Sequence, residues 1–539
     1  MKTRIFHPET EHNAVEEAAA ILREGGLIGI PTETVYGLGA DGLNEDAVRR
    51  IFEAKGRPQD NPLILHVPEA SWLERYCEDV PETAYRLAER FWPGPLTMIL
   101  KRKPIVPLRT TGGLETVGMR CPDHALTRAI IRAAGVPIAA PSGNTSGRPS
   151  PTTAEHMRED MDGKIEGIVD GGPCRVGVES TIIDLTVTPP RLLRPGGLPL
   201  ESLRQVLGEV AVDKAVLGKM PEGERPRAPG MKYRHYAPKA PVTVVVGDPH
   251  RSAAWIWGHV TATAGVICFD EFERIYHGHP VHCLGQASDK GEQARRVFDA
   301  LRTFDDTDVT EIFAQCPDER GLGLAVSNRL KKASGFHIEP AGYGKVIGFT
   351  GGTGAGKTSA LLALKDLGGV IVDADAVYHE MLETSDPMRR DIGAAFGDVF
   401  ASDGTLDRKK LGSVVFGDEK KLQHLNDVVY AHLLPEIARR TLGHDLAGID
   451  AINLFESGLS TLCCRTVGVI APAELRVQRI MARDRIGEDY ARLRIGAQKP
   501  DTYYIDHCTD ILENTADHPD AFRESARAFL LQIIKEEQK

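Results

Sequence analysis

The stretch Gly348-Phe-Thr-Gly-Gly-Thr-Gly-Ala-Gly-Lys-Thr-Ser359 decides the fold of the C-terminal part of this chain. Gly351, four spacer residues and then Gly356-Lys357-Thr358 have the spacing of a phosphate-binding loop. An apolar run at 346–349 precedes the loop and a helical pattern at 359–365 follows it, which predicts a strand, a loop and a helix in that order. The alternative is a glycine-rich turn that binds nothing.

A loop of this kind binds phosphate mainly through its backbone. Glycines let successive N–H groups turn toward phosphate oxygens, and the helix that follows adds its positive end. The lysine reaches the β- and γ-phosphates, and the hydroxyl of Thr358 holds Mg²⁺. We therefore expect ATP with Mg²⁺ in this domain. The residues predicted to bind ATP are Gly354, Ala355, Gly356, Lys357, Thr358 and Ser359.

Two acidic residues end the next apolar run, Val370-Ile-Val-Asp-Ala-Asp375. Residues two apart on a strand share one face, so Asp373 and Asp375 are expected to point into the same pocket. One carboxylate can then orient an acceptor hydroxyl while the other lies near Mg²⁺. The alternative is a solvated strand end. Arginines are frequent in a helical region further along the chain, and one or two of them are expected to close over a transferred phosphate.

The composition excludes several classes of protein. The 539 residues carry a formal net charge of −11, so we expect no stable DNA binding and no attraction to an anionic membrane. No apolar run approaches the ~18 residues of a membrane span. Nine cysteines without a C-x-x-C pair fit a reducing compartment, and the first residues lack the apolar core of a secretion signal. We therefore expect a cytoplasmic protein.

Changes in composition divide the chain into several domains, and the sequence predicts an α/β multidomain protein. Alternating helix and strand patterns predict a first α/β domain over 1–210, and a stretch rich in Pro, Gly, Lys and Arg predicts a linker over 211–241. An apolar strand at 242–246 opens a smaller α/β domain, predicted over 242–338. The phosphate-loop domain, with a parallel sheet, is predicted over 344–539.

Several segments of the first domain suit phosphate oxygens. Lys55-Gly-Arg-Pro-Gln-Asp-Asn-Pro62 combines two cations with prolines that fix the loop, so both cations are expected to face one cavity. Ser142-Gly-Asn-Thr-Ser-Gly147, Gly177-Val-Glu-Ser-Thr181 and Leu193-Arg-Pro-Gly-Gly197 offer hydroxyls and backbone N–H groups. Any one of these segments alone is also explained as a turn, because Gly, Pro, Ser and Asn dominate turns. Taken together, the four segments say more about a phosphate-binding function than any one of them does alone.

Taken together, these segments resemble the YrdC/Sua5 family of L-threonylcarbamoyladenylate synthases, from residue 1 to about 335. The motifs that carry the resemblance are PTETVYGLGA, KGRPQDNPLILHV, FWPGPLT, SGNTSG, GVEST and LLRPGG. The segments APGMKYRHYAP and GLGLAVSNRLKKA resemble the longer form of the family, which has an extra C-terminal domain. One difference is Gly143, where the family usually has alanine. Glycine only removes a methyl group, so the resemblance is hardly weakened.

The resemblance implies a YrdC-like α/β fold followed by a small α/β Sua5 domain. It also implies that L-threonine, bicarbonate and ATP become threonylcarbamoyl-AMP with release of pyrophosphate, and that tRNA-modifying proteins receive the product. By motif match, the residues implied to bind the nucleotide are Lys55, Arg57, Asn61, Thr116, Ser142, Ser150 and Arg194, with Tyr233 as a lid. Those implied to surround threonine are Thr34, His66, Arg120 and Ser180. A histidine satisfied at a strand end is the alternative for His66.

From about residue 344 to 539 the chain resembles dephospho-CoA kinase. The motifs are GFTGGTGAGKTS, VDADAVYH, YAHLLPEI, LFESGL, VQRIMARDR and DILENTAD, together with Gln498. The implied reaction moves the γ-phosphoryl group of ATP to the 3′-hydroxyl of dephospho-CoA. The residues implied to act in it are Asp373 toward that hydroxyl, Lys357 at the phosphates, Arg479, Arg483 and Arg485 as a lid, and Asn514 near the adenine.

Two differences from the kinase family lie where the acceptor is expected. Ile452-Asn453-Leu454 stands where the family usually has a Pro-Leu-Leu type of run before Phe-Glu. Leu433 follows the histidine of the YAHLLPEI motif, where the family tends to have proline. The sequence therefore predicts ATP binding more firmly than it predicts the acceptor.

A function of a different class competes for the first domain, namely an RNA-binding module joined to another small-molecule phosphate-loop kinase. YrdC-like domains present a concave basic surface, but the acidic total charge and the threonine-pocket residues disfavour that interpretation. For the C-terminal domain, the alternatives are another small-molecule kinase or an ATP switch without phosphoryl transfer. The sequence leaves open the oligomeric state, feedback regulation and any coupling of the two activities.

Overall fold

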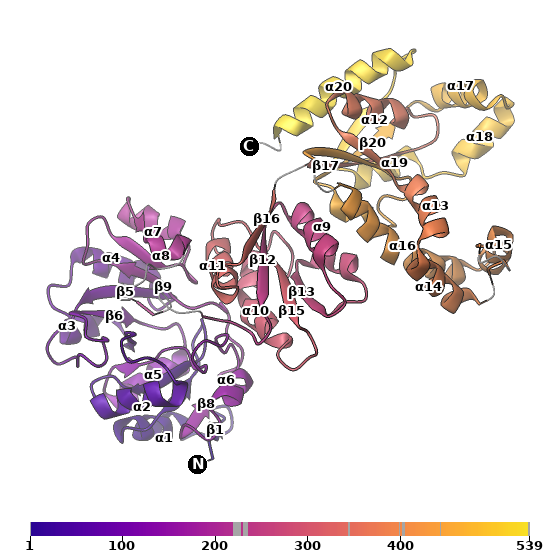
Figure 1. The fold of residues 1–539 in the computed structure, drawn as a ribbon. Coiled ribbons are helices and arrows are strands. Elements are labelled where there is room, and N and C mark those ends of the chain that lie inside the picture. Colours follow the sequence, from indigo (N-terminus) through magenta and orange to yellow (C-terminus); the bar gives the residue numbers. More distant parts are fainter. Residues whose placement is uncertain are drawn as a thin grey trace. The chain divides into compact units, whose positions relative to one another are not determined.

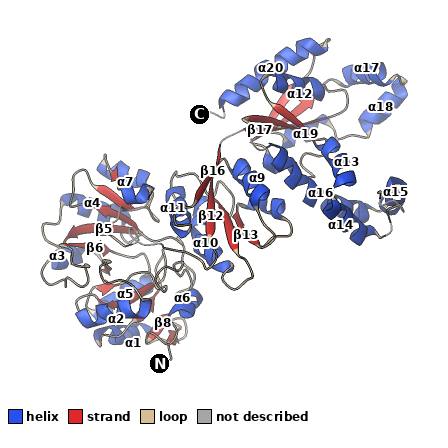
Figure 2. Ribbon diagram, in the orientation of Figure 1, coloured by secondary structure: helices blue, strands red, loops and turns tan. Residues whose placement is uncertain are grey.

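The structure is a computed structural model, and it describes residues 2–218, 228–229, 235–342, 345–397, 399–401, 405–441 and 444–536. Its contacts divide the chain into two compact units. The first comprises Met1–Val246, Thr263–Asp270 and Pro280–Glu339, and the second comprises Gly247–Ala262, Glu271–His279 and Pro340–Lys539. Figure 1 labels the elements along the chain, and Figure 2 distinguishes helices from strands.

The N-terminal domain contains helices and a mixed sheet in which eleven described strands follow the order β1-β8-β2-β3-β7-β4-β6-β5-β9-β10-β11. The strands are β1 Arg4–Phe6, β2 Ile28–Ile30, β3 Gly37–Asp41, β4 Ile64–His66, β5 Leu96–Lys101, β6 Thr116–Arg120, β7 Ile138–Ala139, β8 Gly167–Val169, β9 Thr181–Asp184, β10 Arg191–Arg194 and β11 Ala211–Val212. The helices are α1 Ala14–Arg23, α2 Glu45–Lys55, α3 Leu73–Tyr76, α4 Glu82–Phe91, α5 Ala125–Ala134, α6 Ala154–Met161, α7 Leu200–Leu207 and α8 Lys214–Leu217, with a 3₁₀ turn η1 at Ala70–Trp72.

Strand register brings candidate site residues together at the centre of this sheet. Strands β4 and β6 are parallel and pair His66 with Arg120. Strands β5 and β6 are antiparallel and pair Thr97 with Arg120. The three side chains therefore belong to three adjacent strands, and Ser180 immediately precedes β9, the neighbour of β5. Residues from segments far apart in the sequence thus meet at one place.

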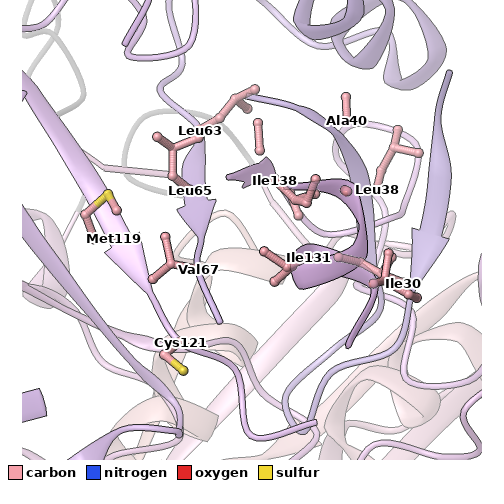
Figure 3. Packing of buried hydrophobic residues seen from close by; sticks show 14 of the residues in the cluster. Ile30, Leu38, Ala40, Leu63, Leu65, Val67, Met119, Cys121, Ile131 and Ile138 are labelled. Atoms are coloured by element: carbon pink, nitrogen blue, oxygen red, sulfur yellow. The ribbon is translucent and has the colours of Figure 1, made fainter. Parts of the chain in front are cut away.

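A buried apolar cluster supports these strands. Helices α1 and α5 pack together, and α1 places Ala18 and Leu22 inside. Figure 3 shows Leu65, Val67 and Ile138 within the same cluster, all of them fully buried. Burying each large aliphatic side chain stabilises the fold by roughly 1.5–3 kcal/mol. The polar ends of the neighbouring strands are therefore held on a rigid base.

The small domain follows at β12 Val242–Gly247, where the sequence pattern predicted its first strand. Its sheet has the order β14-β13-β15-β12-β16, and the described pairs β12–β15, β13–β15 and β13–β14 are parallel. The remaining elements are β13 Ala264–Cys268, β14 Val281–Cys283, β15 Glu311–Gln315, β16 Ile338–Gly342, α10 Lys290–Thr303 and α11 Gly323–Ala333. Helix α9 Pro249–His259 and most of the 3₁₀ turn η2 Asp270–Tyr276 are grouped with the second unit.

The C-terminal domain has the parallel sheet that the phosphate loop predicted, in the order β18-β19-β17-β20-β21. Its strands are β17 Lys345–Gly351, β18 Val370–Asp373, β19 Leu446–Asp450, β20 Arg465–Ile470 and β21 Asp510–Glu513. Its helices are α12 Lys357–Asp366, α13 Ala374–Thr384, α14 Asp386–Phe396, α15 Arg408–Val415, α16 Glu419–Thr441, α17 Ala473–Asp484, α18 Glu488–Gly496, α19 Asp501–His507 and α20 Pro519–Glu536, with a 3₁₀ turn η3 at Leu459–Leu462. The carboxyl ends of β17, β18 and β19 are neighbours, which is where such sheets bind ligands.

The structure corrects one expectation in this domain. Strand β18 ends at Asp373, and α13 begins at Ala374. Asp373 is the N-cap of that helix, its carboxylate accepting the backbone N–H of Ala376, so Asp375 lies in the first helical turn and not on the strand. The expectation of two carboxylates sharing a strand face was wrong, because an acidic residue that caps a helix ends the strand.

No helix in the described ranges combines the length and the apolar character needed to cross a bilayer.

Candidate active sites

A cavity opens in the first unit. The residues that line it come from β4, β6, the end of α2 and the loops around 142–147 and 179–180. Of the residues implied by the sequence, those lining the cavity are Lys55, Arg57, His66, Arg120, Ser142, Ser180 and Arg194. The segments that separately could have been turns therefore form one site.

Lys55 is held at the end of α2 by carbonyl groups. Asn44 caps the start of this helix, accepting the N–H groups of Asp46 and Ala47, and Gly56 ends it at a φ of 62°. The buried Lys55 ammonium donates to the carbonyl oxygens of Ser142 and Asn144. Burial and the nearby Arg57 guanidinium lower the pKa of Lys55 well below its ordinary value. An anion in the cavity would relieve both effects.

Arg120 is anchored on one side by an acidic residue that the sequence analysis missed. Its Nη2 lies 2.8 Å from the Glu33 carboxylate and donates to Thr34 Oγ1 at 2.8 Å. All three side chains are buried. Thr34 touches Arg120 without lining the cavity itself. A planar guanidinium fixed in this way is suited to bind a carboxylate with its remaining N–H groups.

His66 lies beside Arg120 as an uncharged ring. Burial and the Arg120 charge lower the pKa of His66 to about 3. Its Nδ1 lies 3.3 Å from the Ile64 carbonyl oxygen, and a second backbone interaction joins it to Ile138. These backbone contacts support the alternative of a satisfied histidine at a strand end, with the ring forming part of the cavity wall.

Arg194 lines the cavity together with Ser180. Its Nε and Nη2 donate to the Ser180 carbonyl oxygen at 3.2 and 2.9 Å, and Ser180 Oγ lies 2.7 Å from Thr97 Oγ1. Burial lowers the pKa of Arg194 to about 10, so it remains a cation. Glu179 also lines the cavity, and although burial would raise its pKa, Arg329 and Arg194 lower it to about 2.

Three further residues implied for the nucleotide do not line the cavity. Asn61 is buried just before β4, Thr116 begins β6, and Ser150 is buried and donates to Glu179 Oε1 at 2.7 Å. Tyr233 lies outside the described residues. Next along the chain, His235 and Tyr236 do line the cavity. The aromatic and basic character of the linker was the signal that could have identified them.

The phosphate-loop lysine contacts a carboxylate at the end of a neighbouring strand. Lys357 Nζ forms an ion pair with Asp450, the last residue of β19. Burial raises the pKa of Asp450, Lys357 opposes that shift, and the charges of Asp373 and Asp375 add to it. Asp450 was missed in the sequence. The signal was an apolar strand ending in aspartate, as in the Mg²⁺-holding strand of phosphate-loop enzymes.

The phosphate loop itself is held by side chains from α17 and the residues around it. Arg476 Nε donates to the Thr353 carbonyl at 3.0 Å, and Gln498 accepts the Thr353 N–H at 2.8 Å. Gly356 has a φ of 108°, and a Cβ there would lie 2.2 Å from the Asn514 amide nitrogen. Glycine is therefore required at this position, because any side chain would collide with a group that supports the loop.

Two predicted lid or adenine residues bind the loop directly. Arg479 donates to the Gly354 carbonyl at 3.2 Å and to Asn514 Oδ1 at 3.2 Å, and Asn514 donates to the Ala355 carbonyl at 2.8 Å. Arg483 is exposed and pairs with its neighbour Asp484 at 2.7 Å. Arg485 caps the end of α17 at a φ of 55°. The lid and adenine roles remain predictions.

The donor set near Lys357 fits Mg²⁺ bound together with ATP. Within the described ranges, no three His, Cys, Asp or Glu side chains gather as a metal site of their own. Mg²⁺ usually takes one or two carboxylates, several waters and the phosphate oxygens of its nucleotide. The Thr358 hydroxyl at the start of α12 and the Asp450 carboxylate are hard oxygen donors of the right kind.

Comparisons with known proteins show which families this chain matches. The family described as telomere recombination, the Sua5/YciO/YrdC family, matches residues 20–196, and the threonylcarbamoyl-AMP synthase C-terminal domain matches residues 198–335. Over 330 residues, the chain is 51% identical to the threonylcarbamoyl-AMP synthase of Pyrococcus abyssi, an alignment that covers 60% of this chain and 94% of that protein. The chain belongs to the threonylcarbamoyl-AMP synthase family.

Other relatives of this synthase-family chain cover the same region. The threonylcarbamoyl-AMP synthase of Bacillus subtilis is 48% identical over 332 residues, which is 61% of this chain and 95% of that protein. The crystal structure of P. abyssi Sua5 complexed with L-threonine has a TM-score of 0.60 and 48% identity, covering 63% of this chain and 99% of that one. The dephospho-CoA kinase family matches residues 345–520. The chain therefore joins a Sua5-type synthase to a C-terminal dephospho-CoA kinase domain, as the sequence motifs predicted.

Proposed function

We propose that the cavity of the first unit makes L-threonylcarbamoyladenylate from L-threonine, bicarbonate and ATP, for tRNA modification. The observation that carries the proposal is the charge of the cavity wall. Its described lining includes four cations and one carboxylate, namely Lys55, Arg57, Arg120, Arg194 and Glu179. The one carboxylate is already paired with Arg329 behind the wall. Such an excess of cations calls for an anionic ligand, which a triphosphate and an amino-acid carboxylate together supply.

The residues then divide between the two substrates. Arg120, fixed by Glu33 and Thr34, binds the threonine carboxylate, with Ser180 and His66 beside it. Lys55 and Arg57 bind the triphosphate, Ser142 and Arg194 contact the nucleotide, and Ser150 acts through Glu179. Asn61 and Thr116 keep their implied nucleotide roles as proposals, and so does Tyr233 as a lid.

The chemistry requires positioning more than covalent help from the protein. The threonine amine adds to the carbon of bicarbonate, and water leaves to give a carbamate. A carbamate oxygen then attacks the α-phosphorus of ATP, and the bond from that phosphorus to pyrophosphate breaks. A buried cavity protects the unstable carbamate from water, and fixed cations stabilise the charge that moves onto pyrophosphate. Holding the two anions side by side is the main contribution to rate.

Pyrophosphate release by the full chain tests this proposal. Release should require ATP, L-threonine and bicarbonate together, and omission of either co-substrate should reduce it to background. Release that is independent of threonine would contradict the proposal. If the first domain instead acts as an RNA-binding module, RNA should bind tightly and threonine should have no effect on ATP turnover.

For the C-terminal domain we propose transfer of the γ-phosphoryl group of ATP to the 3′-hydroxyl of dephospho-CoA, with Mg²⁺. Support comes from Lys357, Thr358 and Asp450 beside a phosphate loop and from the family match over 345–520. Asp373 is the proposed acid toward the hydroxyl, because one of its oxygens caps α13 and the other accepts no hydrogen bond from the described residues. Arg483 joins the site only after a movement away from Asp484.

The kinase acceptor needs its own test, because the sequence differs from its family there. Asn453 is exposed and interacts with Tyr430, whereas Leu433 is buried within α16. We expect ADP release in the presence of dephospho-CoA at a rate well above that with nucleosides. A preference for nucleosides would point to another small-molecule kinase, and no acceptor-dependent release would point to an ATP switch.

Family resemblance alone supports the transfer of the product, whereas changes in composition along the sequence support the domain boundaries. We propose that the adenylate product passes to tRNA-modifying proteins. We also propose the boundaries 1–210, 211–241, 242–338 and 344–539 for the first domain, linker, small domain and kinase domain.

A further inference from the structure

An arginine of the small domain reaches the wall of the synthase cavity. Arg329, on α11, is fully buried and belongs to the same compact unit as the cavity. Its Nε lies 2.7 Å from Glu179 Oε2, and its Nη1 donates to the Pro195 carbonyl at 2.9 Å. Glu179 lines the cavity, whereas Arg329 lies behind it. The small domain therefore contributes directly to the charge of the site.

Glu179 uses both of its oxygens within the protein. Oε2 binds Arg329, and Oε1 accepts the hydroxyl of Ser150 at 2.7 Å. Another cation near Glu179 is Arg194, which lines the cavity and contributes to the low pKa of the carboxyl group. In the part of the chain that the structure describes, Arg194 forms no ion pair, and its N–H groups bind Ser180 instead.

The two arginines thus have different roles toward one carboxylate. We propose that Arg329 is a positioning residue of the synthase site, which neutralises Glu179 so that Arg194 stays available to the anionic nucleotide. The inference rests on the proposed function, in which Arg194 contacts the nucleotide. It makes the small domain a working part of the synthase site.

The reason is the cost of a buried charge. Removing Arg329 would leave the Glu179 carboxylate without its partner in a buried position, which is strongly unfavourable. The carboxylate would then attract Arg194, the cation already beside it, and turn that guanidinium away from Ser180 and from the ligand. The synthase would lose nucleotide affinity although no residue in contact with the nucleotide had been changed.

The test measures the KM for ATP in threonine- and bicarbonate-dependent pyrophosphate release, which the kinase domain does not produce. Arg329→Met should raise this KM ~10-fold or more, with a smaller effect on kcat. Adding Glu179→Gln should reverse most of the increase, because the amide no longer competes for Arg194. Arg194→Met should raise the same KM on its own. Arg329→Lys, which keeps a charge, should lie between wild type and Arg329→Met.

The matched control is Arg302, on α10 of the same small domain. Arg302 is similarly buried and pairs with Asp160 of the N-terminal domain at 2.5 Å, but it does not line the cavity. Arg302→Met breaks a comparable contact between the same two domains, and it should leave the KM for ATP within about threefold of wild type while lowering thermal stability.

Several outcomes would overturn the inference. A normal KM in Arg329→Met, no rescue by Glu179→Gln, or an equal rise in Arg302→Met would reduce Arg329 to a packing residue. If Arg194→Met has no effect on the KM, the assignment of Arg194 to the nucleotide fails first, and the inference fails with it. If Arg329→Met does not fold, Arg329→Lys is compared with Arg329→Lys/Glu179→Gln by the same criteria.

Discussion

Arg120 Nη2 lies 2.8 Å from the carboxylate of Glu33, and Arg120 belongs to a cavity wall whose described lining has four cations and one carboxylate. The strand register places Thr97 and His66 on either side of this arginine. Glu33 therefore fixes the guanidinium without cancelling the positive charge of the whole site. An arginine that is already oriented loses less conformational entropy when a carboxylate binds.

Arg120→Lys should raise the KM for L-threonine ~10-fold or more, because an ammonium cannot hold Glu33, Thr34 and a substrate carboxylate with the same fork. The KM for ATP should change by less than about threefold. Steady-state pyrophosphate release at varied threonine measures the first effect. Arg102→Lys is the control, since Arg102 also pairs with a carboxylate, Glu115, at 2.9 Å, away from the cavity. Equal effects of the two substitutions would contradict the role of Arg120.

The buried His66 makes the stability of the first unit depend on pH. Its folded pKa of about 3 lies below the ordinary value of 6.5, so the unfolded chain takes up the proton first. The stability that the neutral His66 ring contributes is fully present above about pH 6.5 and is lost as pH falls toward 3. At pH 5 the loss is about 2 kcal/mol.

This pH effect can be measured on the unfolding transition that L-threonine shifts. The midpoint temperature of the transition should fall when the pH is lowered from 7.5 to 5. In His66→Gln this fall should be smaller, by the amount that His66 contributes. An unchanged pH dependence in His66→Gln would show that the ring is not held neutral in the folded protein.

Asp373 and the loop lysine, Lys357, should differ in their kinetic effects. Asp373→Asn should lower kcat for phosphoryl transfer ~100-fold or more with little effect on the KM for ATP, because it orients the acceptor hydroxyl. Lys357→Ala should impair ATP use by the kinase and leave synthase turnover intact. Coupled ADP release measures the kinase effects, and threonine-dependent pyrophosphate release measures synthase turnover. Asp366→Asn, which changes a surface ion pair with Arg523, is the control and should be nearly silent.

The sequence was sufficient for the features that depend on local spacing. The strand, loop and helix around Lys357 follow from glycines and an apolar run, and the cations of the KGRPQDNP segment follow from a family motif. The sequence was insufficient where the role of a residue depends on a partner far away in the sequence. Glu179 pairs with Arg329, which lies 150 positions away in the sequence, and Asp450 pairs with Lys357, which lies 93 positions away. No local pattern marks Glu179 as the partner of a distant arginine.

Gly143 illustrates a second limit. The sequence suggested that glycine in place of the family's alanine removes only a methyl group. In the structure, a Cβ at Gly143 would lie 2.7 Å from both Sδ and Cε of Met157, a fully buried side chain on α6. Met157 occupies the space of that methyl group, so the two positions are coupled through packing.

Gly143→Ala should therefore destabilise the first unit by about 1–3 kcal/mol, the usual cost of overpacking. Thermal unfolding of the threonine-sensitive transition measures this cost. Gly218→Ala is the control, because a Cβ there would meet no described atom within 4 Å. A neutral Gly143→Ala would mean that Met157 rearranges freely, contrary to tight packing around it.

The central claim is that one chain holds two independent ATP sites, and the number of bound nucleotides tests it most directly. Isothermal titration with a non-hydrolysable ATP analogue, Mg²⁺ and L-threonine should give two sites per wild-type chain. The Lys357→Ala variant should retain one site, and threonine should still strengthen binding there. A single site in the wild-type chain, or loss of all binding in Lys357→Ala, would contradict the account.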